Sequence, residues 1–343
     1  MRIPKLFVIA CVAMWSSPAW PWGLDGHRTI GAVADLILKD EPAGAVAQEI
    51  LGTTLSEAGT WADCAKGYCG RPLSPDERAY VQANPQHKEY HYTDVAIQQT
   101  SYQLGTAGTR DDDVVQIINQ TVAVLRGGAA NQGPAVLDQR SALWVMAHMV
   151  GDVHQPLHVG AIYYDQSCDN VVDPNVTGAG QPNFGIGVTS VSTHGGNDLQ
   201  LPNKKGFHVY YWDRGVVAGA MRLADVRNKS IDDFAKYIVA HPPARSDTEG
   251  DPASWAAEWA TEIMPIANAA LTKIAIGQPS RQAGRCTWPV TFDREYTEWA
   301  NQQALALLTK AGFRLAAMVR AVLQTTTPPM SPIPPAQRSR DHQ

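Results

Sequence analysis

The amino-acid sequence predicts an all-α fold: a single helical domain with one long loop and a short β-hairpin. Four segments carry apolar residues at the spacing of one helix face, namely 30–38, 114–125, 142–153 and 304–323. No run of alternating strands between tight turns interrupts them. Hydrophobic residues make up 44% of the 343 residues and charged residues 18%, which suits one sizeable soluble core.

The N-terminus has the pattern of a secretory signal peptide, which we expect to span residues 1–21. Arg2 and Lys5 precede an apolar run over 6–14, and small residues follow at 16–19. This run is too short for a membrane span, and no other stretch is long and apolar enough to be one. The sequence therefore predicts a secreted or periplasmic protein in an oxidising compartment.

Two further segments are predicted to be irregular. Residues 166–203 are rich in Gly, Asn and Pro and indicate a long loop, with a short hairpin over 185–192. Residues 325–343 are rich in Pro and Ser and favour a disordered tail. With no repeat and no interior linker in the sequence, residues 22–324 are expected to form one domain.

The cysteines fit export. Cys11 leaves with the signal peptide, and an even number remains: Cys64, Cys69, Cys168 and Cys286. Two disulfides are expected, with three possible pairings. A Cys64–Cys69 bridge would close a small loop and leave the other two cysteines to each other. The spacing is not that of a zinc finger.

The net charge excludes one class of function. It is −5, and removal of Arg2 and Lys5 with the signal makes it −5 − 2 = −7. This is not the electrostatic pattern of a duplex-DNA binder. An enzyme with a metal centre does not need a basic surface, because the metal supplies the local positive charge.

The densest chemical signal lies between residues 148 and 158. His148 and Asp152 are four residues apart and share one helix face, so both can reach one metal ion. Pro156 ends the helix, which lets His158 serve a second metal. His154 points away from His148 and is expected to make a hydrogen bond in the core. Three histidines and an aspartate in eleven residues favour zinc, and the apolar neighbours indicate a buried helix whose Asp needs a partner.

Together with other motifs, this segment resembles the zinc-dependent S1/P1 nucleases, a family related in fold to bacterial zinc phospholipase C. The segment matches the family signature His-x-x-Gly-Asp-x-His-Gln-Pro-Leu-His. The resemblance covers about Trp22 to Leu323 and implies a phospholipase C/P1 nuclease-like fold. The other matching motifs, in family order, are Trp22–His27, Trp61–Asp63, His91–Asp94, Gly195–Asn197 and His208–Asp213.

The resemblance implies three zinc ions as cofactors. Their implied ligands are Asp63, His91 and His148 for the first ion; Trp22 (amino group and carbonyl) and His27 for the second; Asp152 as a bridge between these two; and His158, His208 and Asp213 for the third. Histidine nitrogens and carboxylate oxygens are ligands that zinc prefers. A free amino group on Trp22 requires that Trp20 and Pro21 be removed, although cleavage after Ala19 is the more natural signal-peptidase site.

The last implied ligand pair has unusual spacing. The family usually has His-x-x-x-Asp at this point, one turn apart, whereas His208 and Asp213 are five residues apart. In a regular α-helix these side chains would point about 140° from each other. A π-bulge, with its i→i+5 hydrogen bonds, would bring them onto one face.

The resemblance also implies the residues that act on the substrate. Asp63, Lys66 and Asp152 are implied in catalysis, and Lys66 stands where the family often has Arg, so it would act on phosphate as a point charge. Tyr92 would stack on a base, and Asp94 would accept hydrogen bonds from the base edge. Asn197 would assist them.

The function implied is that of a secreted, monomeric endonuclease and 3′-nucleotidase. It would hydrolyse single-stranded DNA and RNA to 5′-phosphorylated products. One alternative is a zinc phospholipase C acting on phospholipid head groups. The phospholipases of this fold carry Glu at the last ligand position, so Asp213 and the base contact Asp94 favour nucleic acid. A second alternative is a secreted module that zinc stabilises and that has no enzymatic activity.

Overall fold

The computed structural model describes residues 22–129, 132–176, 190–226, 228, 230–245 and 248–323. The expected signal peptide over 1–21, the expected tail over 325–343 and most of the expected hairpin over 185–192 lie outside these residues.

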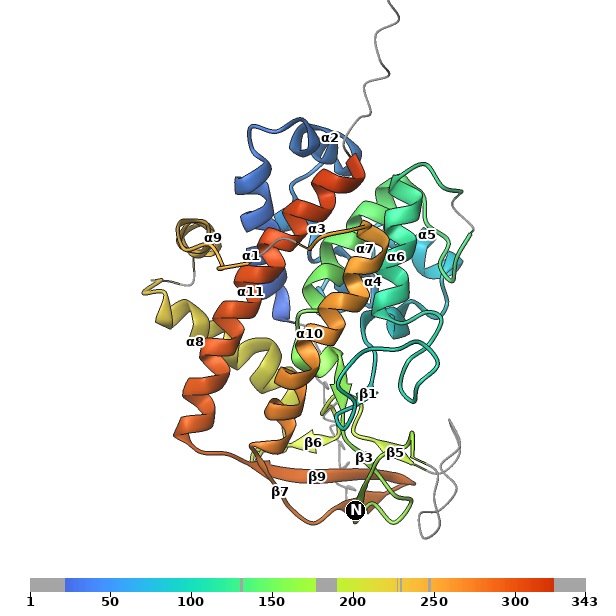
Figure 1. Ribbon diagram of the computed structural model, residues 1–343, viewed down its shortest axis with the longest axis vertical. Coiled ribbons are helices and arrows are strands. Elements are labelled where there is room, and N and C mark those ends of the chain that lie inside the picture. The colour runs from blue at the N-terminus through green and yellow to red at the C-terminus, as the bar shows by residue number, and fades with distance from the viewer. Residues whose placement is uncertain are drawn as a thin grey trace, which may run out of the picture.

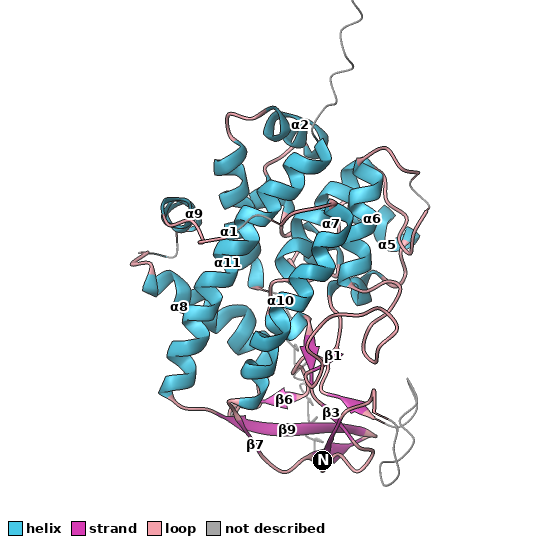
Figure 2. Ribbon diagram, in the orientation of Figure 1, coloured by secondary structure: helices cyan, strands magenta, loops and turns pink. Residues whose placement is uncertain are grey.

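The described chain is mainly helical, as predicted, and its few strands gather at one end of the molecule (Figures 1 and 2). Each of the four segments with helical periodicity lies in or largely within a helix. The α-helices are α1 (Gly23–Leu38), α2 (Pro42–Leu51), α3 (Leu55–Ala58), α4 (Trp61–Ala65), α5 (Pro75–Ala83), α6 (Val114–Leu125), α7 (Gln139–Asp152), α8 (Val216–Leu223), α9 (Ile231–Ala240), α10 (Pro252–Thr272) and α11 (Arg294–Leu323). Three further helical segments are η1 (His87–His91), η2 (Pro156–His158) and the π-helix η3 (His208–Gly215).

Helix α7 is the centre of the fold. Asp138 begins it with a capping box, because its side chain accepts the Ser141 N–H while the Ser141 hydroxyl oxygen accepts the Asp138 N–H. The helix is buried almost throughout from Ala142 to Asp152, and it packs against α6, α2, α3, α4 and α11. A helix enclosed on all sides holds its polar residues at fixed positions, which suits a site built on His148 and Asp152.

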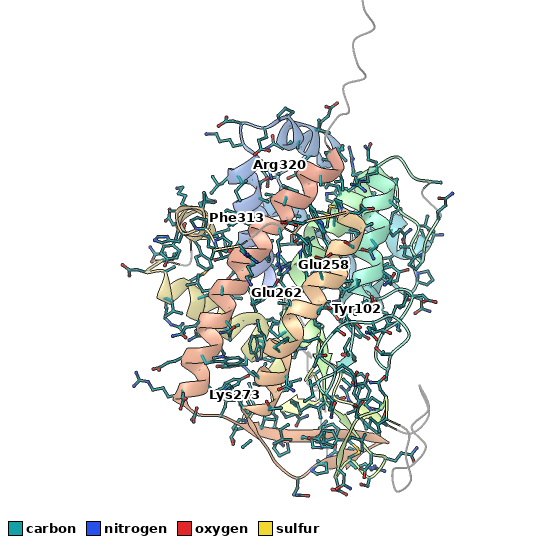
Figure 3. All side chains as sticks on the ribbon, viewed as in Figure 1. Tyr102, Glu258, Glu262, Lys273, Phe313 and Arg320 are labelled. Carbon is teal, nitrogen blue, oxygen red and sulfur yellow. A yellow bond between two sulfur atoms is a disulfide. The ribbon has the colours of Figure 1, made fainter. Side chains whose placement is uncertain are left out.

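Helices α1 and α11 pack along each other, and α10 and α11 run side by side in Figure 1. Glu262 on α10 forms ion pairs with Lys310 and Arg314 of α11, and Figure 3 shows Glu262 in the space between these two helices. Burial acts to raise the pKa of Glu262, but the hydrogen bonds from the two cations lower it to about 2. This carboxylate therefore stays ionised and links the two longest helices.

The strands form three small sheets. Strand β1 (Val95–Ala96) pairs in parallel with β2 (Gly160–Ala161). Strand β3 (Tyr163–Tyr164) pairs antiparallel with both β4 (Val171–Val172) and β5 (Val191–Ser192). Strand β9 (Arg285–Thr291) pairs in parallel with β6 (Leu199–Gln200) and antiparallel with β7 (Ala275–Ile276) and β8 (Ser280–Gln282). The predicted long loop over 166–203 thus contains three short strands, and the described end of the predicted hairpin pairs with β3.

The disulfide pairing is the one in which Cys64 and Cys69 close a small loop and the other two cysteines bond to each other. Cys64 bonds to Cys69, with their Cα atoms 4.8 Å apart, and Cys168 bonds to Cys286, with Cα atoms 6.4 Å apart. The second bridge links the β3–β4 turn to β9, so the strand end of the molecule is covalently tied together. None of the helices in the described part of the chain has the length and apolar composition needed to cross a bilayer.

Candidate metal centre

Eight side chains from distant parts of the sequence meet in one buried cluster. They come from α1, α4, η1, α7, η2 and η3, and each is at most 4% exposed. They fall into three groups, and within each group the possible ligand atoms lie within 4.8 Å of one another. The groups are His27, His148 and Asp152; Asp63, His91 and His148; and His158, His208 and Asp213.

Asp152 stands between the groups. Its Oδ1 lies 3.3 Å from His27 Nε2, while its Oδ2 lies 2.9 Å from His91 Nδ1 and 3.1 Å from His148 Nε2. The two oxygens therefore face different histidines. Asp63 approaches from the other side, with Oδ1 3.8 Å from His148 Nε2 and 3.3 Å from Lys66 Nζ.

Backbone carbonyls orient three of the histidine rings. In each ring Nδ1 is hydrogen bonded to a carbonyl oxygen at 2.6–2.8 Å, which leaves Nε2 to face the cluster. His91 differs, because its Nδ1 faces the cluster. The carbonyl pairs are His148 with Gly59, His158 with His91, and His208 with Gly195.

Two motif glycines allow this close packing. A Cβ on Gly151 would lie 2.7 Å from Nδ1 of His27, so a side chain would displace the ring. Gly195 has φ +56°, a conformation that favours glycine, and a Cβ there would lie 1.9 Å from the carbonyl oxygen of Leu157. Both positions therefore require glycine for reasons of space.

The spacing between His208 and Asp213 is accommodated by a π-helix. Segment η3 runs from His208 to Gly215, and its wider turn places Asp213 Oδ1 3.5 Å from His208 Nε2. Gln155, to which sequence reasoning assigned no role, lies between them. Its Nε2 donates to Asp213 Oδ1 at 2.8 Å, and its Oε1 accepts the Leu157 N–H at 2.5 Å. The only sequence feature that could have indicated a role for Gln155 is its position inside the 148–158 motif.

His154 lies behind the cluster, as expected of a core histidine. Its Nδ1 is 2.7 Å from the Val150 carbonyl oxygen, and Arg314 Nη1 approaches Nε2 at 3.0 Å. Burial, followed by the Arg314 charge, lowers the pKa of His154 to about 3. The ring is therefore neutral, with its proton on Nδ1 and Nε2 as the acceptor.

Trp22 lies beside the first group. Its side chain is fully buried, and its Nε1 donates to the Gly151 carbonyl at 2.8 Å. Its own carbonyl accepts the Gly26 N–H at 3.2 Å and so begins α1. The first of these hydrogen bonds holds Trp22 against the residue before Asp152.

The protonation states suit metal ligands. Burial lowers the pKa of His27, lowers that of His91 well below its ordinary value, and lowers that of His158 to about 3. These rings are neutral at pH 7 and keep a lone pair. For His148 burial also acts to lower the pKa, but the charges of Asp152 and Asp63 outweigh it and raise the value. The two carboxylates thus attract positive charge into the cluster.

The cluster also contains polar atoms that make no hydrogen bond within the described structure, although Asp63 Oδ1 lies 3.3 Å from Lys66 Nζ, and Asp152 Oδ1 lies 3.3 Å from His27 Nε2. These atoms are buried and have no hydrogen-bond partner among the described residues: both ring nitrogens of His27, both oxygens of Asp63, Asp152 Oδ1, His158 Nε2 and Asp213 Oδ2. Each such atom costs about 1–3 kcal/mol when nothing compensates it. Cations would satisfy them, and a set of imidazole nitrogens and carboxylate oxygens fits zinc.

A cavity of about 610 Å³ opens beside the cluster. All four residues that the sequence suggested for substrate contact line it: Lys66, Tyr92, Asp94 and Asn197. It is also lined by four residues that sequence reasoning missed: Tyr68, Lys88, His194 and Arg285. Of these, His194 adjoins the Gly195–Asn197 motif, whereas nothing in the local sequence pointed to Arg285.

Tyr92 and Asp94 are fixed differently within this cavity. The Tyr92 hydroxyl donates to Glu89, and the Arg110 guanidinium lies 5.3 Å from the ring centroid. Asp94 is buried, and burial raises its pKa. Its Oδ2 accepts from the Ser192 hydroxyl at 3.3 Å, while its Oδ1 has no hydrogen-bond partner in the described structure. Asp94 thus offers an unused acceptor beside an aromatic ring.

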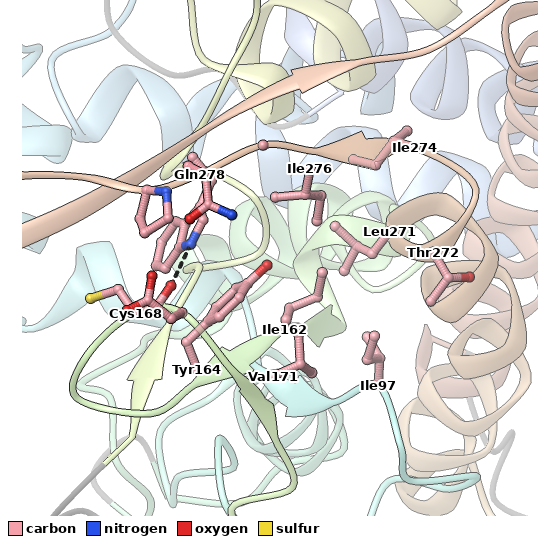
Figure 4. A pocket seen from close by; sticks show the side chains of 14 residues that line it. Ile97, Ile162, Tyr164, Cys168, Val171, Leu271, Thr272, Ile274, Ile276 and Gln278 are labelled. Atoms are coloured by element: carbon pink, nitrogen blue, oxygen red, sulfur yellow. Dashed lines mark hydrogen bonds between the residues drawn. The ribbon is translucent and has the colours of Figure 1, made fainter.

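A second cavity, of about 410 Å³, lies at the strand end of the molecule (Figure 4). Its walls are mostly apolar, with Ile97, Ile162 and Leu271 among the labelled side chains. No residue of the three groups lines it. The chemistry-bearing side chains therefore belong to the other cavity.

The fold and the cluster together define a mainly helical protein with a buried histidine–aspartate centre beside an open cavity. The family model for S1/P1 nuclease matches residues 22–324, so the chain belongs to the S1/P1 nuclease family, a family of zinc-dependent hydrolases. Nuclease S1 of Aspergillus oryzae (strain ATCC 42149 / RIB 40) is 26% identical over 166 residues. That match covers 46% of this chain and 50% of the relative, so the chain spans about half the length of the curated relative.

Proposed function

We propose that this protein is a zinc-dependent endonuclease and 3′-nucleotidase of single-stranded DNA and RNA. The observation that carries the proposal is a buried cluster of three histidine–aspartate groups, of which His91, His158, His208 and Asp213 line one cavity. The zinc ligands proposed are Asp63, His91 and His148; Trp22 and His27; and His158, His208 and Asp213; with Asp152 shared by the first two ions. Bound zinc supplies Lewis-acid chemistry and lowers the pKa of water.

The protein's own groups position the phosphate and balance its charge. Lys66 lies 3.3 Å from Asp63 and lines the cavity, so its ammonium can approach a phosphate oxygen at the wall. The oxygen of a water molecule bonds to phosphorus, the P–O3′ bond breaks, and a proton from the water ends on O3′, which leaves a 5′-phosphate on one product and a 3′-hydroxyl on the other. Gln155 holds Asp213 in place on the side where the leaving oxygen would lie.

The base would be held by Tyr92 and Asp94. Stacking on Tyr92 needs an exposed base face, and the free Oδ1 of Asp94 can accept an N–H from a base edge. A paired base offers neither, which supports single strands as the substrate. We expect the mature protein to be a monomer over residues 22–324, secreted or periplasmic, and the two disulfides agree with an oxidising compartment.

Single-stranded DNA and RNA oligonucleotides should be cut faster than a duplex of the same sequence, by about tenfold or more, because a duplex must first unstack a base. The assay compares initial rates and identifies the products by mass. Tyr92→Ala should reduce this preference. Equal rates on single strands and duplex would contradict the proposal. Phosphatidylcholine vesicles are assayed in parallel, and release of the head group without nucleic-acid cleavage would favour the phospholipase alternative.

The N-terminus offers a separate test. A chain that begins at Trp22 should bind three zinc ions, because Trp22 then has a free amino group that can act as a ligand. A chain with Gly-Ser before Trp22 should bind fewer ions or bind them more weakly. Zinc is measured by elemental analysis after dialysis. Three ions and full activity in the extended chain would rule out the N-terminal ligand.

A further inference from the structure

Two exposed cations on the cavity wall share one buried carboxylate. The carboxylate is Asp198, whose side chain is 1% exposed. Its Oδ2 lies 2.6 Å from Nδ1 of His194, and its Oδ1 accepts Arg285 Nε at 2.6 Å. The side chains of His194 and Arg285 are 55% and 66% exposed. A buried carboxylate that holds two exposed cations keeps them in place beside each other without burying either.

The backbone around this arrangement is well anchored. Asp198 accepts the Trp288 N–H of β9 at 3.0 Å, and its own N–H donates to the Thr193 carbonyl at 3.2 Å. The His194 N–H donates to the Ser192 hydroxyl at 2.9 Å. The loop over 193–198 is therefore tied both to β9 and to β5, so the two cations sit on a rigid support.

This loop and the adjoining Ser192 contact a proposed zinc ligand, His208, and a proposed base-binding residue, Asp94. The Gly195 carbonyl accepts from Nδ1 of His208, and the Ser192 hydroxyl donates to Asp94. Because Nδ1 of His194 is engaged with Asp198, Nε2 is the ring nitrogen that a ligand can reach. The hydrogen bond to Asp198 acts first in raising the pKa of His194, which favours the charged ring. The single negative charge of Asp198 then faces two positive charges, so the three side chains together present a net positive charge to the cavity.

We propose that His194 and Arg285 bind a second phosphate of the substrate, one that is not cleaved. This inference rests on the proposed function and names its preferred substrate: a nucleic-acid chain with at least two phosphates, over a molecule with one. Nε and Nη2 of Arg285 both face Asp198 Oδ1, so Nη1 of Arg285 and the His194 Nε2–H are the groups left to donate to phosphate oxygens. The catalytic scheme above uses neither residue, and it assigns Lys66 to the phosphate that is cleaved.

The test compares two substrates that differ in phosphate number. One is a dinucleoside monophosphate and the other a hexanucleotide of the same base. In His194→Ala and in Arg285→Ala, KM for the hexanucleotide should rise about 5- to 10-fold, the size expected for one partly exposed charged contact. KM for the dinucleoside monophosphate and kcat on both substrates should stay within about twofold. Arg285→Lys keeps the positive charge, so its KM for the hexanucleotide should rise less than that of Arg285→Ala. The slope of log KM against the logarithm of the salt concentration should fall by about 0.7 for each phosphate that the variant no longer neutralises.

Controls separate this role from a structural one. His241→Ala and Arg294→Ala change exposed residues that do not line the cavity, and should alter neither KM. His194→Gln removes the charge of the ring, but its amide can still donate a hydrogen bond to Asp198. It replaces His194→Ala in the test if the alanine variant lowers the unfolding temperature. Equal KM increases on both substrates, or no change on either, would overturn the inference while leaving the proposed function intact. If the unmodified protein cleaves neither substrate, the proposed function fails, and this inference fails with it.

Discussion

Asp152→Ala should abolish hydrolysis and lower the zinc content by more than one ion per molecule. Its Oδ1 faces His27 at 3.3 Å, while its Oδ2 faces His91 and His148 at 2.9 and 3.1 Å. A carboxylate shared by two metal ions fixes the geometry of both, so its removal should disturb both. Zinc is measured by elemental analysis of the dialysed protein, and activity on a single-stranded oligonucleotide.

Asp213→Ala is the matched comparison. Asp213 faces His208 of its own group, whereas Asp152 faces histidines of two groups, so Asp213→Ala should lose about one zinc ion and leave the other two in place. It removes the same type of side chain from an equally buried position. If Asp152→Ala loses a single ion and remains active, Asp152 does not bridge. If both variants lose the same number of ions, the distinction between the groups is also wrong.

Removal of metal should lower the thermal stability substantially. Seven buried nitrogen and oxygen atoms of the cluster have no hydrogen-bond partner in the described structure. Each of these atoms that no ion pair compensates costs about 1–3 kcal/mol, so several kcal/mol of folding free energy depend on the bound cations. For a chain of this size that corresponds to a fall of about 10 °C or more in Tm. Thermal unfolding is followed before and after treatment with a chelator that is then removed by dialysis.

Zinc added back should restore Tm, whereas magnesium should not, because magnesium prefers oxygen ligands and the cluster is rich in imidazole. The Asp213→Ala variant should show a smaller shift on chelation than the unmodified protein, because one group is already disrupted. An unchanged Tm after complete removal of metal would contradict the view that the unpaired atoms await cations.

Much of this site was predictable from local patterns. The four-residue spacing of His148 and Asp152 on an apolar helix predicted a buried pair on one face, and both side chains are fully buried on α7. The apolar periodicity predicted four helices. These predictions succeeded because helix geometry relates residues that are close in the sequence, and the hydrophobic pattern selects the buried face.

Other features depend on contacts between distant segments. The five-residue spacing of His208 and Asp213 left open whether the two meet, and the π-helix that brings them together is packed within the folded chain. The carbonyls of Gly59 and Gly195 orient histidines that lie 89 and 13 residues away. No local spacing encodes such partners, because they exist only once the helices have packed.

By itself, then, the sequence predicted four helices through apolar periodicity and the pair His148 and Asp152 through its spacing, and its resemblance to a family implied the other residues of the cluster. The tertiary structure alone decided that the two oxygens of Asp152 face different histidines. It also decided that Arg285, 87 residues from Asp198, joins His194 on the cavity wall. The physical reason is that side-chain chemistry and helix period are local properties, whereas the distance between two groups depends on how the whole chain packs.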